Sequence, residues 1–566
     1  MLAARGGADN GACGGADRAG QLPMRRFLPA LALPVAVVAA VAVFAYLTQG
    51  PEADLVWTAV GEVTTLDPGR MTALQDGRVA DALFEGLAVL DPRSLEPRPG
   101  VAERWDVSDD GRTYAFHLRA DARWSDGRSV TAEDFAYAWR RALDPETAAE
   151  YAYMLFPIRG AKAYYKAAAK ARNEEQKAAL GSEVGIRVEG PRRLVVELEQ
   201  PTAYFLDLVA FSTYLPVRRD VVESWGDRWA FPPHLISNGA YRLTQWRFQS
   251  RMRWEKNPYY WNAGAVALER IEVRVYEEPN TALVAYETGE IDLTTSVPAL
   301  AKTPLLEASR AGRRRDVLNV ANLGTYFYRF NCTKGALADA RVRRALALAL
   351  DRQEIVDRAA RGGQAPATVL VPPGMAGYES PAGLAESVEE ARRLLAEAGY
   401  AGGEGLPEFA LLVNKRGEAH VAIAEMVQQQ WRDRLGVRTR IEQVEWKVFL
   451  DRVHDLDYEI SRDGWYGDYV DPNTFLDLFV TGGGNNKTGW SNAAYDALIT
   501  KAANETDAAA RARTLAEAEA ILLAETPIMP IYFYTTVILV RPGLVGVEPN
   551  LLNRIDFGRL SWRRGG

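Results

Sequence analysis

The sequence predicts an α/β protein of two or three domains. A chain of 566 residues, 48% hydrophobic and 25% charged, is long enough to bury more than one core. Residues 420–435 are predicted to form a helix that ends at Gly436, and residues 437–441 form a strand directly after it. A strand that follows a helix in this way is typical of α/β construction.

The first half of the chain contributes the clearest strands. Residues 55–58 are predicted to form the first strand, and Leu66-Asp67-Pro68 breaks it. Residues 113–119 alternate between apolar and polar side chains, which indicates a half-buried strand. Leu194, Val196 and Leu198 repeat this alternation until Pro201 stops it.

Between these strands, Trp124-Ser125-Asp126-Gly127 is predicted to be a turn. Thr131 is predicted to cap the helix that follows. Glu133 and Asp134 stand in its first turn, where the helix dipole favours acidic side chains.

Helices dominate the second half. Asp351-x-x-Glu354 predicts a capping box, and Ser387 opens an amphipathic helix that Gly399 ends. Residues 508–525 are predicted to form an Ala-rich helix. Residues 528–540, rich in β-branched and aromatic side chains, are predicted to be strands that cross back between domains.

Composition argues against several classes of protein. The formal charge of −7 and the lack of a basic stripe exclude nucleic acid as an expected partner. The two cysteines are Cys13, which precedes a hydrophobic leader, and Cys332, which is expected to be a buried thiol. The four histidines show no metal-ligand spacing, so no metal or cofactor is expected.

Enzyme motifs are lacking too. Residues 482–488 superficially resemble a phosphate-binding loop, but Asn486 rather than Gly precedes Lys487, and Gly489-Trp490 breaks any following helix. We find neither a G-x-S-x-G elbow nor a G-x-G-x-x-G turn between a strand and a helix. The sequence therefore predicts a protein that is not an enzyme.

The N-terminus predicts export. Met24-Arg25-Arg26 precedes an uncharged apolar run at 27–47, about long enough for one bilayer crossing. Residues 24–50 are therefore a signal peptide or a membrane anchor, and the sequence leaves both possibilities open. The Gly/Ala-rich residues 1–23 are expected to be a disordered upstream extension, with Met24 the true start. The expected location is periplasmic or otherwise extracytoplasmic.

The most informative stretch is residues 462–469. It places Asp468 among aromatic rings and glycines that leave backbone open to a guest. A carboxylate in such a setting can hold a cationic amine, while bare amides and carbonyls can pair with another main chain. This chemistry suits capture of a peptide by its amino end. The alternative is a surface turn with a buried Trp.

Two further residues are candidates for ligand contact. His420 is predicted at a helix N-terminus, where the imidazole tends to be neutral and free amides can receive an anion. Glu62 stands between a strand end and a Pro turn. A surface histidine and a simple turn acid are the competing interpretations.

Several blocks together resemble the family 5 solute-binding proteins of bacterial ABC importers. The resemblance runs in order from about residue 54 to the C-terminus. The blocks that carry it are residues 101–127, 238–241, 257–261, 289–292, 341–345, 445–447 and 464–469.

The resemblance implies a bilobal, three-domain periplasmic-binding-protein fold (type II), in which ligand is buried between the lobes. Lobe 1 is expected to combine a core domain with an inserted domain at 75–218, and lobe 2 to be residues 324–536. The core domain of lobe 1 is expected to consist of residues 54–74, 219–323 and 537–566.

The resemblance also assigns roles to residues. It implies that Asp468 pairs with the α-ammonium of a short peptide, and that Arg462 and His420 meet the carboxylates of guests of different length. Other positions line the cleft: Glu62, Tyr151, Trp446, Trp465, Tyr466 and Tyr534, with Gly464 and Gly467 nearest the guest's backbone.

Two departures from the family pattern concern the pocket. An arginine expected after Trp446 is shifted, with Arg452 adjacent and Val453 in its place. Tyr466 replaces a smaller residue, which narrows a pocket. Both departures leave the preferred peptide open.

The resemblance implies a monomeric receptor that delivers short peptides to the permease and ATPase of an ABC transporter. Relatives with the same fold bind dipeptides, cell-wall peptides or nickel chelates, and these guests stay as alternatives. A retained leader would instead indicate a membrane-tethered peptide sensor or chaperone.

Overall fold

The computed structural model describes residues 52–171, 173–415 and 419–563, and residues 53–566 belong to one compact unit. The predicted leader and the extension before it lie outside the described residues. Within the part that is described, no helix is both long enough and apolar enough to cross a membrane.

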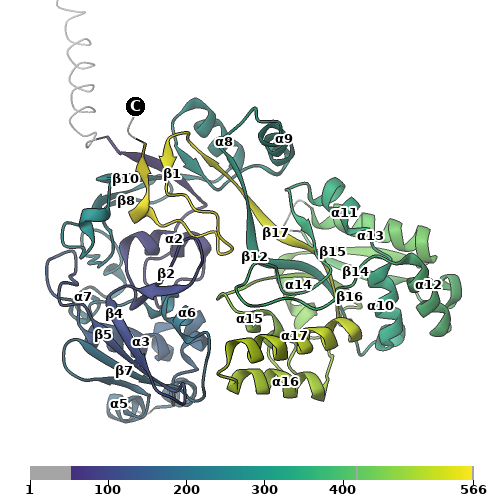
Figure 1. The fold of residues 1–566 in the computed structure, drawn as a ribbon, viewed down its shortest axis with the longest axis horizontal. Helices are drawn as coiled ribbons and strands as arrows, with labels where there is room; N and C mark the ends of the chain where they lie inside the picture. Colours follow the sequence, from purple (N-terminus) through teal and green to yellow (C-terminus); the bar gives the residue numbers. More distant parts are fainter. Residues whose placement is uncertain (1–51, 172, 416–418, 564–566) are drawn as a thin grey trace, which may run out of the picture. The chain divides into compact units, whose positions relative to one another are not determined.

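A large mixed sheet extends through both lobes (Figure 1). From lobe 2 to lobe 1, its strands follow the order β15 (Thr439–Val444), β14 (Phe409–Asn414), β16 (Ile460–Tyr466), β12 (Val317–Phe330), β17 (Ile528–Val540), β11 (Leu293–Thr294), β1 (Leu55–Val60), β10 (Arg270–Tyr276), β9 (Arg251–Lys256) and β8 (Tyr241–Arg247), with β13 (Ala365–Pro366) beside β17.

The two long strands β12 and β17 join the lobes (Figure 1). Their antiparallel pairing is regular up to Ala321 opposite Thr535 and resumes with Thr325 opposite Phe533. Residues 322–324 lie in this interruption, so their backbone groups are released from the ladder. The N–H of Leu323 instead donates to the carbonyl of Leu551 (2.6 Å), and its carbonyl accepts from the N–H of Gly467 (2.8 Å).

Lobe 1 carries a separate four-stranded sheet in the order β4 (Ala102–Val107), β5 (Thr113–Leu118), β7 (Arg193–Glu197) and β6 (Ile186–Val188). The predicted alternation of β5 is confirmed, because Tyr114, Phe116 and Leu118 are buried. Helix α3 (Ala132–Leu143) begins with the predicted cap at Thr131. The side chain of Thr131 accepts from the backbone N–H of Asp134, and the side chain of Asp134 accepts from the backbone N–H of Thr131.

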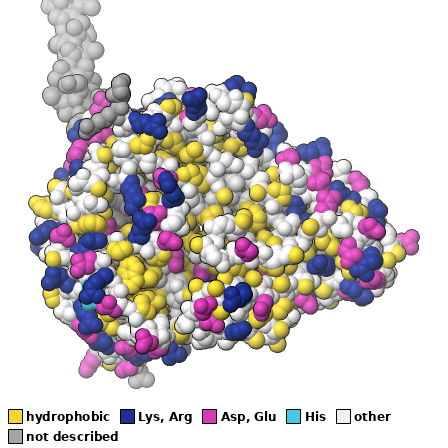
Figure 2. Space-filling model, viewed as in Figure 1, with side chains coloured by type: hydrophobic (Ala, Val, Ile, Leu, Met, Phe, Trp, Pro, Cys, Tyr) yellow, Lys and Arg dark blue, Asp and Glu magenta, His cyan; other side chains and the backbone are white. Residues whose placement is uncertain are grey.

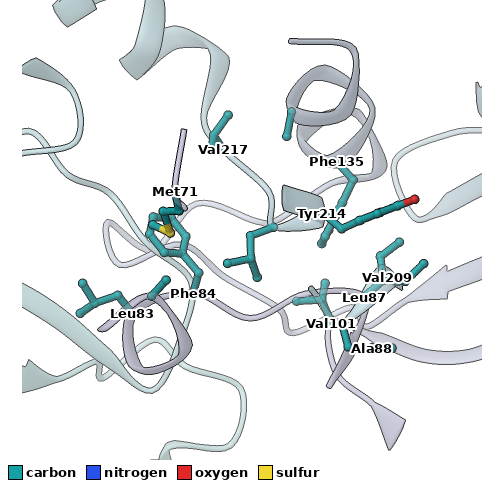
Figure 3. Close-up of a cluster of buried hydrophobic side chains, with 14 of the residues drawn as sticks. Met71, Leu83, Phe84, Leu87, Ala88, Val101, Phe135, Val209, Tyr214 and Val217 are labelled. Atoms are coloured by element: carbon teal, nitrogen blue, oxygen red, sulfur yellow. The ribbon is translucent and has the colours of Figure 1, made fainter. Parts of the chain in front are cut away.

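Helix α2 (Leu74–Leu83) is fixed in lobe 1 by an apolar cluster. Met71 and Leu83 lie near Phe84 in that cluster (Figure 3). All three side chains are at most 3% exposed. Because both ends of the segment are buried, its exposed residues are held in a defined position.

Lobe 2 confirms most of the predicted helices. Helix α12 (Val388–Glu397) is capped by Ser387, α13 (His420–Leu435) ends at Gly436, and α17 (Ala508–Glu525) has the predicted bounds. Residues 528–540 form the single strand β17.

Two local predictions need correction. Only half of the predicted capping box at Asp351 forms, because its backbone N–H donates to the side chain of Gln430. The helix it caps, α11 (Arg352–Ile355), is correspondingly short and continues as a π-helical turn, Val356–Ala360. Strand β15 begins at Thr439, two residues later than expected.

The remaining α-helices are α4 (Ala161–Ala168), α5 (Glu174–Ser182), α6 (Phe205–Val209), α7 (Arg219–Trp225), α8 (Pro279–Thr288), α9 (Ala299–Arg310), α10 (Ala340–Leu348), α14 (Trp446–His454), α15 (Asn473–Leu476) and α16 (Ala493–Asn504). Short strands are β2 (Ala88–Leu90), β3 (Pro97–Pro99), β18 (Leu544–Val545) and β19 (Ser561–Trp562). A 3₁₀ helix, η2 (Glu150–Leu155), lies near the site described next.

Candidate ligand-binding site

The carboxylate of Asp468 is positioned by the turn that follows β16. This strand pairs with β12, so that Tyr466 lies opposite Gly324. The chain then leaves the sheet, and the N–H of Asp468 donates to the hydroxyl of Thr474 (3.2 Å). With the bond from Gly467 to Leu323, this contact holds the acid beside the interruption between the lobes.

The carboxylate of Asp468 accepts a hydrogen bond from a neutral side chain of lobe 1. The hydroxyl of Tyr153, in η2 of lobe 1, donates to its Oδ2 (3.3 Å). Among the described residues, no Lys, Arg or His nitrogen lies within 4 Å of it. Burial raises the pKa of Asp468 to about 6, although the hydrogen bond from Tyr153 acts in the opposite direction. A cationic group would supply the counter-charge that this site lacks.

Asp468 lines a cavity of about 500 Å³. Its walls come from the segment that leads into α2, from η2 and the end of α6, from the interruption in β12, from the turn after β16, and from a C-terminal segment. The lining side chains are mostly apolar. They include Met71, Leu74, Tyr151, Phe211, Leu323, Tyr466, Leu551 and Leu552.

Hydrophobic side chains are exposed through the middle of the face drawn in Figure 2, and acidic and basic side chains lie among them as well as toward the edges.

A buried ion pair supports the turn that carries Asp468. Arg511, on α17, donates to both carboxylate oxygens of Asp471 (2.6 and 2.9 Å), and both side chains are about nine-tenths buried. The ring of Tyr469 stacks on that of Tyr204 from lobe 1, with centroids 4.4 Å apart. The turn is therefore packed from both lobes.

Aromatic rings continue along the same face of β16. Tyr466 is 54% exposed and stacks on Tyr534 of β17 at 4.4 Å. A Cβ at Gly464 would lie 2.2 Å from the hydroxyl oxygen of Tyr534, so glycine leaves room for that ring. The predicted residues Gly464, Tyr466 and Tyr534 are thus brought together.

Arg462 and His420 form a second polar cluster further along β16. Arg462 donates to the side-chain oxygen of Asn414 (2.6 Å), and its guanidinium lies 5.9 Å from the ring centroid of Trp446. The Nδ1 of His420 is 3.2 Å from the hydroxyl of Tyr326. Burial, reinforced by Arg462, lowers the pKa of His420 to about 4, so the imidazole is neutral at pH 7.

Of the predicted site residues, four line the cavity: Tyr151, Tyr466, Gly467 and Asp468. Glu62 and Trp465 belong neither to this lining nor to the two groups just described along β16. The carboxylate of Glu62 accepts from the indole N–H of Trp246 (3.2 Å) and from the backbone of Gln249 (2.7 Å). Trp465 packs against an apolar cluster of lobe 2 that contains Phe475. Successive side chains of a strand alternate between faces, which separates Trp465 from its neighbours Gly464 and Tyr466. Ligand contact by Glu62 and Trp465 stays a prediction.

Sequence reasoning missed most of the cavity wall. Its leucines belong to no motif, and they come from segments of the chain that are hundreds of residues apart: Leu74, Leu323, and the pair Leu551 and Leu552. Tyr153 was also missed, although it stands only two residues from Tyr151 in the same aromatic segment.

A mixed sheet shared by two lobes, with a cavity lined from both of them, is the arrangement of a bilobal solute-binding protein. Residues 96–487 match the family described as "Bacterial extracellular solute-binding proteins, family 5 Middle". The chain belongs to this family, and an extracytoplasmic location follows from it.

Relatives of known structure or function agree. The chain is 36% identical over 496 residues to the oligopeptide-binding protein OppA of Bacillus subtilis, covering 86% of this chain and 88% of the relative. The unliganded open form of MppA, a periplasmic murein tripeptide-binding protein, superposes with a TM-score of 0.79 at 32% identity, covering 91% of this chain and 98% of MppA.

OppA of Haemophilus influenzae was solved in complex with the peptide RPPGFSPFR. It matches with a TM-score of 0.70 at 30% identity, covering 91% of this chain and all of that protein. The chain therefore has the periplasmic-binding-protein fold, with the cavity between its lobes.

Proposed function

We propose that this protein captures short oligopeptides outside the cytoplasm and delivers them to the permease and ATPase of an ABC transporter. The single observation that carries the ligand class is Asp468, a carboxylate with no basic partner among the described residues, set in a mostly apolar cavity. The family and the peptide-binding relatives support the same class.

The chemistry of capture follows from this geometry. The α-ammonium of a guest pairs with the carboxylate of Asp468 and replaces the water lost on burial. The guest's main chain then runs along β16. Among the described residues, the pairing of this strand with β14 ends at Ser461, so a guest can add as a further strand beyond that point. Both lobes supply cavity walls, so closing them around a guest buries it.

The far end of the guest meets the second polar cluster. Arg462 lies six residues from Asp468, which corresponds to at most roughly 20 Å, because the chain leaves the sheet after Tyr466. A peptide of up to about five or six extended residues covers the distance between the two charged groups. Because His420 is neutral at pH 7, Arg462 is the cation of this cluster that a carboxylate would meet.

Calorimetry with matched peptides tests the proposal. Alanine pentapeptide with a free amino group is expected to bind, and its N-acetylated form to bind at least 100-fold more weakly, because acetylation removes the cation. Equal binding of the two forms, or no binding of either, would contradict the proposal. Mass spectrometry of molecules released from the denatured protein provides an independent check, since peptides should be recovered.

A further inference from the structure

The basic side chains that line the cavity beside Asp468 are engaged within the protein. Two arginines line it. Arg78 donates to Thr295 (2.9 Å) and to the carbonyl of Asn553, and Arg554 pairs with Asp81 (2.6 Å). The guanidinium of Arg554 is therefore neutralised by Asp81, and that of Arg78 is hydrogen-bonded, before any guest binds.

Two large apolar side chains lie exposed on opposite walls. Leu74, the first residue of α2, is 56% exposed, and Tyr466, at the end of β16, is 54% exposed. Both line the cavity. Exposed apolar surface concentrated in one concave site is a mark of binding, because a guest that covers it removes that surface from water.

Both side chains are held by what lies beneath them. The ring of Tyr466 is stacked on Tyr534, and α2 is anchored through the buried Leu83 and Phe84 (Figure 3). A guest therefore meets preformed walls, and little conformational entropy is lost from the protein when they are covered.

The carboxylate of Asp468 determines which part of a peptide enters. An α-ammonium paired with it brings the first Cα of the guest to the cavity, so the first side chain projects from there. Tyr466 is two residues from Asp468, within the reach of one long side chain. The volume of about 500 Å³ is in the range that holds whole small ligands, so the largest amino-acid side chains fit.

We propose that the protein selects peptides by their first side chain, and that it prefers large apolar residues such as Leu and Phe next to a free amino group. This selectivity rests on the proposed function, since it presumes a peptide anchored at Asp468. The preference follows from the apolar side chains in the walls around the first residue, Leu74 and Tyr466 among them.

A basic first residue is the competing guest. Asp207 also lines the cavity, and a lysine side chain could reach it. Apolar side chains make up most of the lining, however. Burial, with Asp471 nearby, also raises the pKa of Asp207 to about 7, so much of it is uncharged at neutral pH. The observations therefore favour the apolar guest.

Calorimetry with pentapeptides X-Ala-Ala-Ala-Ala, where X is Leu, Phe, Ser or Lys, tests this inference. The Leu and Phe peptides are expected to bind at least about tenfold more tightly than the Ser peptide, from burial of one apolar side chain. Equal binding of all four, or tightest binding of the Lys peptide, overturns the selectivity and leaves peptide capture intact. Failure of all four to bind overturns both proposals.

Variants of the wall locate the preference. Leu74→Ser is expected to reduce the advantage of Leu over Ser peptides by about threefold or more, because the change removes apolar surface from the cavity wall without altering Asp468. Leu300→Ser is the matched control, since Leu300 is 87% exposed on α9 and does not line the cavity. An unchanged Leu advantage in Leu74→Ser, or an equal loss in the control, contradicts the assignment.

Discussion

Asp468→Asn is the substitution that most directly tests the site. Asparagine keeps the size of the side chain and can still accept the hydrogen bond from Tyr153, so the change removes charge alone. In the proposed complex of the wild type, the guest's ammonium and the carboxylate of Asp468 meet in a cavity that excludes much of the solvent. In the variant the ammonium is buried without its counter-charge.

The expected cost follows from this desolvation. Removing one partner of a buried pair costs about 3–5 kcal/mol, and a pair at a surface is worth less than about 1 kcal/mol. Because the cavity that Asp468 lines is open to solvent on one side, we take about 3 kcal/mol. That corresponds to a loss of affinity of roughly 100-fold.

Titration calorimetry with alanine pentapeptide measures this loss directly. Asp451→Asn is the matched control, because it removes the same charge from an exposed position on α14 and should leave the affinity unchanged. Unfolding in urea should show Asp468→Asn to be at least as stable as the wild type, since burial disfavours the ionised carboxylate. An affinity within threefold of wild type would refute the ammonium anchor.

Three further predictions concern pH and stability. Burial raises the pKa of Asp468 to about 6, and the guest pairs with the ionised form, so the affinity for peptide should be constant just above pH 7 and fall about tenfold by pH 5. In Asp468→Asn the affinity should not depend on pH over this range. Asp471→Ala leaves Arg511 buried without its partner and should lower the free energy of unfolding by about 3–5 kcal/mol. Glu390→Ala, at the exposed pair with Arg393, is the control and should change the stability far less, because solvent screens that pair. Equal effects of the two substitutions in urea unfolding would contradict the burial argument. Gly436→Ala should destabilise the protein by more than about 1 kcal/mol in urea unfolding, because φ of Gly436 is +70° and the new Cβ would lie 2.2 Å from the carbonyl oxygen of Gly402. Gly264→Ala is the control, because a Cβ at Gly264 would have no atom within 4 Å.

Local order was predictable from sequence wherever neighbouring residues decide it. Helix α13 begins at His420 and ends at Gly436 as predicted, because an apolar periodicity and a left-handed glycine are local signals. The capping box at Asp351 formed only in part for the opposite reason: Gln430, 79 residues away, takes the backbone N–H that the box would have used.

The candidate site shows the same division. The residue types of the 462–469 segment, an acid among rings and glycines, were enough to single out Asp468 and the positions around it. The alternation of side chains along β16 places Trp465 on the opposite face of the strand from Tyr466. Glu62 is hydrogen-bonded to Trp246 and Gln249, in a different part of lobe 1 from the cavity.

The amino-acid sequence by itself determined the α/β class, the ends of helices α12, α13 and α17, and the charged group proposed to hold a guest, since each depends on residues close together in the chain. Only the tertiary structure decided the character of the cavity. Its walls combine residues as distant as Leu74, Leu323 and Leu551, and the arginines that line it are engaged by groups from other segments. Apolar burial is non-directional and carries no motif, so which leucines meet at one carboxylate depends on how the lobes are packed.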